Sequence, residues 1–373
     1  MSINGARAIF SIMIAYVTHY MVLIGSPFLG KGGDIFFDTT CLMMTGSDFF
    51  FVVSGFLVCL KYEERFVNHT IKFIDYIRPK IIKIYPLVIV MAVLVYILEI
   101  KGKIEFGEYP LHEYKGDERY TLFNLILNIL GLQCGWISEM DDRAINGPSW
   151  FVSILMICYA IHFLIAKYGK KLRIILYICM ICLGVFIIVR ESELPLLYSN
   201  NGRGYYCYFM GVLIAEVMER LNFKNIKVIN VLSNIAALMS IILFIISYKC
   251  VWDGPVNSSN IMILGFYPIF LFTIVYNNFF YKIFSNRILV WLGNMSLEIF
   301  LCNIPTLLVI KYFMLKLNIN VDLLNIKAYI VIIIISIFVA YIMKEFFVKN
   351  MSIMLQKLFG GREVEKNNYR EIS

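Results

Sequence analysis

Long apolar runs separated by short polar stretches dominate this sequence. A helix needs roughly 20 apolar residues to cross a bilayer. Ten runs approach that length, at residues 8–29, 40–60, 82–100, 148–166, 172–189, 205–218, 228–248, 261–281, 288–310 and 327–347. Apolar residues are 60% of the chain and charged residues 16%, which excludes a soluble globular protein or a disordered chain. We therefore predict an all-α fold, a polytopic membrane bundle of about ten transmembrane helices.

An eleventh apolar segment, 121–136, is shorter and carries two Asn and a Gln, so we predict a re-entrant or interfacial helix there. With ten spans and the N-terminus inside, 22 of the 34 Lys and Arg residues fall on the inner side. This bias fits the positive-inside rule and places both termini in the cytoplasm. If 121–136 crossed the membrane, the bias would reverse.

The spans leave two larger polar segments. The loop at about 101–147 is acidic and falls on the extracytoplasmic side, and residues 348–373 form a polar cytoplasmic tail. Paired spans broken by Gly or Pro, which are typical of inverted-repeat transporters, are not recognisable. We predict a multi-pass protein of the cell membrane.

Arg7 and His19 lie in the first predicted span. Ionisable residues inside spans are costly and are therefore functional candidates. Twelve positions separate them, about 18 Å along a helix and about 120° around it. A histidine at this depth could act as a general base on a hydroxyl, or it could simply hydrogen-bond a neighbouring helix. A π-bulge would bring the two side chains to one face, and we predict one between Ala8 and Thr18.

The second predicted span begins with the polar segment 46–57. Asp48 could orient or balance the charge of an imidazole, and Ser54 and Gly55 allow helix backbones to approach closely. Taken alone, this segment is more typical of a packing face built from small residues.

A basic segment leads into the third predicted span. Arg78, Lys80 and Lys83 precede a Tyr-Pro pair that begins at Tyr85. The positive-inside rule explains such residues without any function. The alternative is an electrostatic seat for an anionic, phosphate-bearing cofactor.

Two later segments, 146–159 and 291–305, carry further polar groups. Asn146 and Trp150 lie at the outer end of a span, where a turn and an interfacial aromatic are ordinary. Glu298 is the one carboxylate near the middle of its span, and Asn303 follows in the same helix.

Taken in order, these blocks resemble the bacterial membrane-bound acyltransferase family 3. The matching positions are Arg7 and His19, the Gly-x-Asp-x-Phe-Phe-x-x-Ser-Gly-Phe block at 46–56, the basic stretch at 78–86, Gly-Pro-Ser-Trp at 147–150, Tyr-Phe-x-Gly at 208–211 and Leu-Gly-x-x-Ser at 292–296. The resemblance covers roughly residues 5–345, and it makes residues 1–347 one membrane acyltransferase domain.

The resemblance implies transfer of an acyl group, usually acetyl, from cytoplasmic acetyl-CoA to a hydroxyl of a cell-envelope glycan, exopolysaccharide or lipid-linked sugar. His19 resembles the family's proton acceptor and Arg7 its charged partner, with Asp48 and Ser54 facing the same cavity. The expected assignments of the remaining residues are donor binding for Arg78, Lys80, Lys83 and Tyr85, and substrate binding for Asn146, Trp150, Glu298 and Asn303. We expect no metal and no nucleic acid partner.

Three departures from the family pattern qualify this picture. The spacing from Arg7 to His19 is one residue longer than usual, Asn303 stands where many members have His, and Leu155 stands where some have Glu. The alternative function is a transporter or flippase of lipid-linked sugars, without acyl-transfer chemistry. A flippase needs neither a first-helix histidine nor a cytoplasmic basic cluster, so these features favour the acyltransferase.

Overall fold

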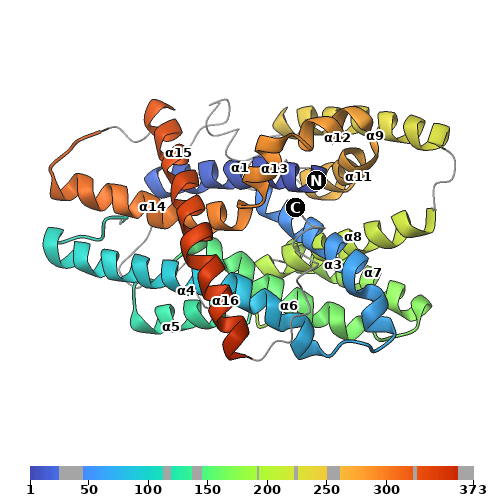
Figure 1. Cartoon of the computed structure of the whole chain (residues 1–373), viewed down its shortest axis with the longest axis horizontal. Helices are drawn as coiled ribbons and strands as arrows, with labels where there is room; N and C mark the ends of the chain where they lie inside the picture. The colour runs from blue at the N-terminus through green and yellow to red at the C-terminus, as the bar shows by residue number, and fades with distance from the viewer. Residues whose placement is uncertain are drawn as a thin grey trace.

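The computed structural model describes residues 1–24, 45–111, 119–136, 145–190, 193–221, 226–249, 261–321 and 326–359. These residues form a helical bundle with one two-stranded hairpin (Figure 1). The helices are α1 (Ser2–Ile24), α3 (Gly46–Val67), α4 (Phe73–Phe106), α5 (Leu122–Leu130), α6 (Trp150–Ile165), α7 (Lys170–Arg190), α8 (Ser199–Leu221), α9 (Ile226–Lys249), α11 (Tyr267–Tyr276), α12 (Asn278–Phe284), α13 (Arg287–Gly293), α14 (Ser296–Lys316), α15 (Ile326–Ile342) and α16 (Lys349–Leu358). The shorter elements are the 3₁₀ turn η4 (Gly147–Ser149), the π-helical turns η5 (Ile261–Phe266) and η6 (Met343–Val348), and the strands β1 (Glu193–Leu194) and β2 (Leu197–Tyr198).

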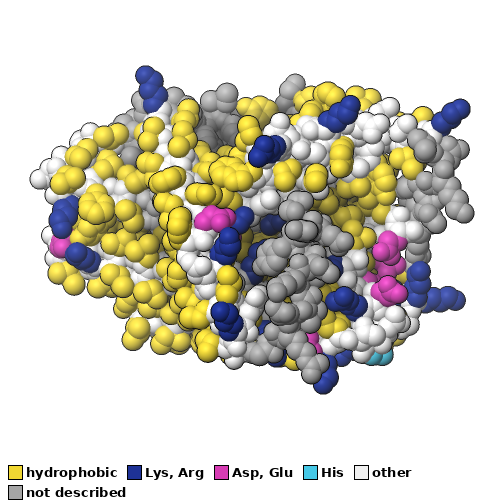
Figure 2. Space-filling view, viewed as in Figure 1, with side chains coloured by type: hydrophobic (Ala, Val, Ile, Leu, Met, Phe, Trp, Pro, Cys, Tyr) yellow, Lys and Arg dark blue, Asp and Glu magenta, His cyan; other side chains and the backbone are white. Residues whose placement is uncertain are grey.

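The described residues of the ten predicted runs are mostly helical, and residues 25–29 and 40–44 of the first two runs lie outside the described residues. Within the described part of the chain, six helices are long and apolar enough to cross a membrane, and a bent pair of helices would add a seventh. Hydrophobic side chains cover much of the face that Figure 2 shows, most continuously over α4, α14 and α15. A surface this apolar is suited to contact with lipid tails rather than with water. Together with the long apolar helices, it identifies the chain as a multi-pass membrane protein.

The bent pair is the predicted run 261–281, which turns by 91° between α11 and α12. Asn277 stands at this corner, and its Oδ1 accepts hydrogen bonds from the backbone N–H groups of Phe279 and Phe280 at 3.1 and 3.2 Å. Its Nδ2 donates to Oδ1 of Asn234 in α9 at 2.8 Å. One asparagine therefore caps α12 and ties the corner to a neighbouring helix.

The segment 121–136 contains only the nine residues of α5, about 14 Å of helix, which cannot cross a bilayer. Its polar residues bind it to the start of α6. Asn128 Nδ2 and Gln133 Nε2 each donate to Ser149 Oγ at 2.9 Å, and Ser153 Oγ donates to Gln133 Oε1 at 2.9 Å. The side chains that made this run poorly apolar are those that anchor it.

Proline inside α14 frees a backbone carbonyl that another element satisfies. Pro305 has no N–H to donate to the Leu301 carbonyl, four residues earlier. Asn146 Nδ2 donates to that carbonyl at 3.1 Å. Because lipid supplies no replacement hydrogen bond, this contact couples the loop before α6 to the bend in α14.

Pro86 frees the Ile82 carbonyl of α4 in the same way, and Ser352 Oγ of α16 donates to it at 3.4 Å. In Figure 1, the continuous helix α15–η6–α16 passes across α14 and α4. It continues to Leu358, beyond residue 348, where we had placed the start of a polar tail. Residues 360–373 of that tail lie outside the described residues.

Helices α3 and α8 approach each other closely. A Cβ added at Gly55 would collide with the backbone carbonyl of Tyr208, and one at Gly211 with that of Val52. Glycine at both positions lets the two backbones touch, as the small residues of segment 46–57 suggested. This contact brings the polar side chains of α3 next to those of α8.

Candidate functional site

Arg7 of α1 points into the helix bundle. Its guanidinium carbon lies 5.9 Å from the ring centroid of Phe50 in α3, and its charge interacts with Glu298 of α14 and Tyr159 of α6. The Arg7 side chain is half-buried among these helices. Among the described residues, no carboxylate lies within ion-pair distance of Arg7.

Tyr159 connects two predicted site residues, although the sequence had not singled it out. Its hydroxyl interacts electrostatically with Ser54 and Arg7, and its ring centroid lies 5.1 Å from Nζ of Lys80. Arg7 and Ser54 were predicted for the reaction and Lys80 for the donor. Tyr159 brings these two groups of residues into one region.

Lys80 lies in an aromatic cage. Its Nζ is 3.7 Å from the ring centroid of Tyr76 and 4.4 Å from that of Tyr62, with Tyr159 as the third wall. The ammonium also donates to the Tyr76 carbonyl at 3.3 Å. Cation–π contacts hold a lysine in place without neutralising its charge. The cage therefore presents a fixed positive charge toward the bundle interior.

The other residues of the basic segment are dispersed around α4. Arg78 is half-buried and Lys83 is exposed, so the three cations do not converge on one point. Tyr85 is partly buried, and its hydroxyl occupies the space beside Gly131, just after α5.

Buried polar atoms without hydrogen-bond partners gather on α14. They include Ser296 Oγ, Glu298 Oε2 and both polar atoms of the Asn303 side chain, and these residues are 0%, 3% and 5% exposed. Asn146, which packs against this helix, leaves its Oδ1 unpaired as well. Each such group costs about 1–3 kcal/mol unless a ligand or water pairs with it. Within the described part of the chain these atoms have no protein partner, which makes them candidates for hydrogen bonds to water or to a polar ligand.

Asp48 pairs with an arginine that the sequence analysis had not considered. Arg203 Nε and Nη2 of α8 donate to the two Asp48 carboxylate oxygens at 3.2 and 2.9 Å, and Nη2 also donates to Ser47 at 3.2 Å. The guanidinium lies 5.2 Å from the Trp150 ring centroid. The described partner of Asp48 is therefore a guanidinium, and Trp150 belongs to the same unit.

His19 lies in α1, but its side chain is outside the described residues. The π-bulge predicted between Ala8 and Thr18 is wrong, because α1 is α-helical throughout Ser2–Ile24. Ser11 Oγ donates to the Ala8 carbonyl at 2.8 Å, and the helix accommodates this bond without an inserted residue. On an unbroken helix, His19 stands about 18 Å from Arg7 and about 120° around the axis.

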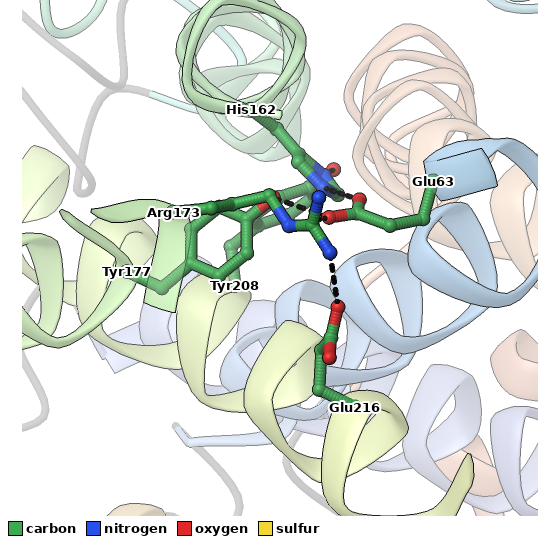
Figure 3. A network of polar contacts seen from close by, with 6 residues as sticks. All are labelled: Glu63, His162, Arg173, Tyr177, Tyr208 and Glu216. Atoms are coloured by element: carbon green, nitrogen blue, oxygen red, sulfur yellow. Dashed lines mark hydrogen bonds and ion pairs between the residues drawn. The ribbon is translucent and has the colours of Figure 1, made fainter. Parts of the chain in front are cut away.

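A second polar network, which the sequence analysis missed entirely, joins α3, α6, α7 and α8 (Figure 3). His162 is fully buried, with Nε2 at 2.8 Å from Glu63 Oε2 and Nδ1 at 2.9 Å from the Tyr208 hydroxyl. The Tyr177 hydroxyl donates to Glu63 Oε1 at 2.8 Å.

Arg173 completes this network by pairing with two carboxylates. Its Nε lies 2.7 Å from Glu63 Oε1, and its Nη2 donates to Glu216 Oε1 at 3.0 Å. Cys59, Glu63 and Glu216 place three possible metal ligands within 4.8 Å of one another. Because the Arg173 guanidinium already serves both carboxylates, we assign no metal here.

The missed residues carried a signal that could have revealed them. His162 and Glu216 lie inside predicted spans, where ionisable residues are candidates. Glu63, Arg173 and Arg203 lie within three residues of a span or inside its first turn, and we had explained such positions by topology. Which of these residues contact one another depends on how the helices pack. Short-range patterns in a single sequence do not specify that packing.

The chain can be compared with known proteins on this basis. A family model described as an acyltransferase domain matches residues 2–345, nearly the whole chain. No curated protein and no solved structure matches the chain. The matched range contains Arg7, the Lys80 cage and the polar residues of α14. The chain therefore belongs to the membrane-bound acyltransferase family 3.

Proposed function

We propose that this acyltransferase moves an acetyl group from cytoplasmic acetyl-CoA to a hydroxyl of a cell-envelope glycan or exopolysaccharide. The observation that carries the proposal is Arg7, a guanidinium among helices that has no ion-pair contact with any carboxylate of the described residues. An uncompensated charge in such a place is expensive, so a ligand with negative or developing negative charge is its natural complement.

Lys80 supports the donor half of the proposal. Its caged ammonium is a fixed cation near the point where α4 begins, and Arg78 and Lys83 add positive charge on the same helix. With both termini in the cytoplasm, this end of α4 faces the cytoplasmic pool of acyl-CoA. The phosphates of the donor are the groups that such cations bind.

The chemistry that we propose uses His19 as the base. His19 takes the proton of the acceptor hydroxyl, and the oxygen attacks the thioester carbonyl. The negative charge of the tetrahedral intermediate is stabilised by a nearby cation or donor, the C–S bond breaks, and the CoA thiolate leaves with the proton from His19. The separation of about 18 Å between Arg7 and His19 suits an extended donor, with its acyl end toward His19.

Asn146, Trp150, Glu298 and Asn303 would meet the polar groups of the substrates. The unpaired atoms on α14 support this assignment, because each needs a hydrogen-bond partner that the described protein does not provide. Asp48 and Ser54 line the same region through Arg203 and Tyr159.

The decisive experiment is NMR of surface polysaccharide from cells that carry wild-type protein or His19→Ala. We expect acetyl ester signals with the wild type and their loss with His19→Ala at equal membrane abundance. Purified wild-type protein should also hydrolyse acetyl-CoA slowly, and Lys80→Ala should raise the KM for it. An active His19→Ala protein would remove His19 from the mechanism. Glycan movement without any consumption of acetyl-CoA would favour a flippase.

A further inference from the structure

The network around His162 lies directly behind the Lys80 cage. Tyr208 is the residue that they share, because its hydroxyl lies 2.9 Å from His162 Nδ1 and its ring meets that of Tyr159 edge to face at 5.9 Å. Tyr159 in turn meets Tyr76 edge to face at 6.0 Å. One cage wall, Tyr159, therefore packs directly on Tyr208, and a second, Tyr76, packs on Tyr159.

On the side of the network away from Lys80, several hydrogen bonds and ion pairs hold the same carboxylate, that of Glu63. Glu63 receives His162 on one oxygen and both Tyr177 and Arg173 on the other, and Arg173 is held again by Glu216. As Figure 3 shows, these side chains converge from four helices on one point. An imidazole held this firmly on Nε2 has little freedom left on Nδ1, so it fixes the position of the Tyr208 hydroxyl.

Both contacts of His162 are fully buried. Neither Tyr177 nor Tyr208 exposes any surface, and their ring centroids lie 5.4 and 5.6 Å from the imidazole. The two tyrosines differ in what lies beyond them. Tyr177 leads to Glu63, whereas Tyr208 leads to the cage.

We infer that His162, acting through Tyr208, is a positioning residue for Lys80, and that the buried network orients the tyrosine cage that holds the donor-binding cation. This inference rests on the proposed function, since it assigns Lys80 to the phosphates of the acyl donor. It goes beyond a stabilising role because it predicts an effect on one substrate and on one kinetic constant.

The test compares two variants that each remove one buried hydroxyl beside His162, Tyr208→Phe and Tyr177→Phe. We expect Tyr208→Phe to raise the KM for acetyl-CoA roughly tenfold with kcat nearly unchanged. Tyr177→Phe is the matched control and should leave both constants near the wild-type values. With acetyl-pantetheine, a donor without phosphates, the two variants should behave alike.

A second arm asks whether the effect passes through Lys80. In a Lys80→Ala background, adding Tyr208→Phe should raise KM no further, because coupled residues are not additive. Equal KM values for Tyr208→Phe and Tyr177→Phe would overturn the inference, as would an equal rise in KM for acetyl-pantetheine. A different result would contradict the proposed function itself. In that case the wild-type protein would not turn over acetyl-CoA, or Lys80→Ala would leave the KM for acetyl-CoA unchanged.

Discussion

Arg173 and Arg7 are both guanidiniums enclosed by helices, but their surroundings differ. Arg173 binds Glu63 and Glu216 within a network that joins four helices. Arg7 lies over Phe50, and the nearby Glu298 is outside ion-pair contact and keeps a carboxylate oxygen unpaired. A paired buried charge holds a structure together, whereas an unpaired one costs stability and is retained where a ligand completes it. Burial alone does not distinguish structural from functional charges, but pairing does.

The largest expected effect comes from breaking the paired region. Glu63→Gln removes the charge on which His162, Tyr177 and Arg173 converge, so we expect it to lower the free energy of unfolding by about 3–5 kcal/mol. Unfolding in detergent micelles measures this loss. The control is Glu345→Gln, which breaks an exposed pair with Lys349 at 3.6 Å and should cost at most about 1 kcal/mol. Equal losses would show that the network adds nothing beyond a surface pair.

Arg7→Gln tests the guanidinium that has no ion pair among the described residues. We expect acetyl transfer to fall roughly 100- to 1,000-fold, because the cation that would bind the anionic part of the extended donor is lost. The free energy of unfolding should stay the same or rise, since no ion pair is broken. Both are measured on the same preparation, as ester formation and as unfolding in detergent. Destabilisation as large as that of Glu63→Gln would class Arg7 as structural.

A smaller effect is expected for Asn146, which hydrogen-bonds the backbone of α14 and is also proposed to bind substrate. Asn146→Leu leaves the Leu301 carbonyl unpaired and should cost about 1–3 kcal/mol of stability. In a Pro305→Ala background, the new backbone N–H can bond that carbonyl, so the same substitution should cost less. Unfolding of the four proteins in this double-mutant cycle gives the coupling. Strict additivity would mean that the Asn146 contact does not compensate for the proline.

The smallest effect is expected at the long contact between α16 and α4. Ser352→Ala removes a 3.4 Å hydrogen bond to the Ile82 carbonyl, and we expect a loss of no more than about 1 kcal/mol, seen as a slight fall in unfolding temperature. Acetyl transfer should be unaffected. A loss as large as that of Asn146→Leu would mean that α16 is a main support of the Pro86 bend.

Much of the helical layout could be predicted from apolar run lengths, because lipid imposes one length scale on every span. The short α5 was also predictable, since Asn128 and Gln133 interrupt its run. The right-angle turn at Asn277 was not, because the run 261–281 is otherwise apolar enough for a straight span and its Asn pair at 277–278 does not by itself specify a corner.

The candidate site was only partly predictable. Arg7, Ser54 and Lys80 were identified by residue type and order, but Tyr159, which joins them, looked like an ordinary aromatic in a span. Asp48 was identified without its partner Arg203, which lies 155 positions away in the chain. Such pairings depend on which helices pack together, as the glycine contacts of α3 with α8 determine.

The corner at Asn277 also constrains how the protein is made. A translocon releases apolar segments into lipid one by one, and an amide that enters lipid alone is penalised. Asn277 has its partner, Asn234, on the preceding helix α9. The free-energy cost of placing the two asparagine side chains in lipid is low only when they are hydrogen-bonded to each other. We therefore expect α9 and α11 to enter the membrane as one hairpin.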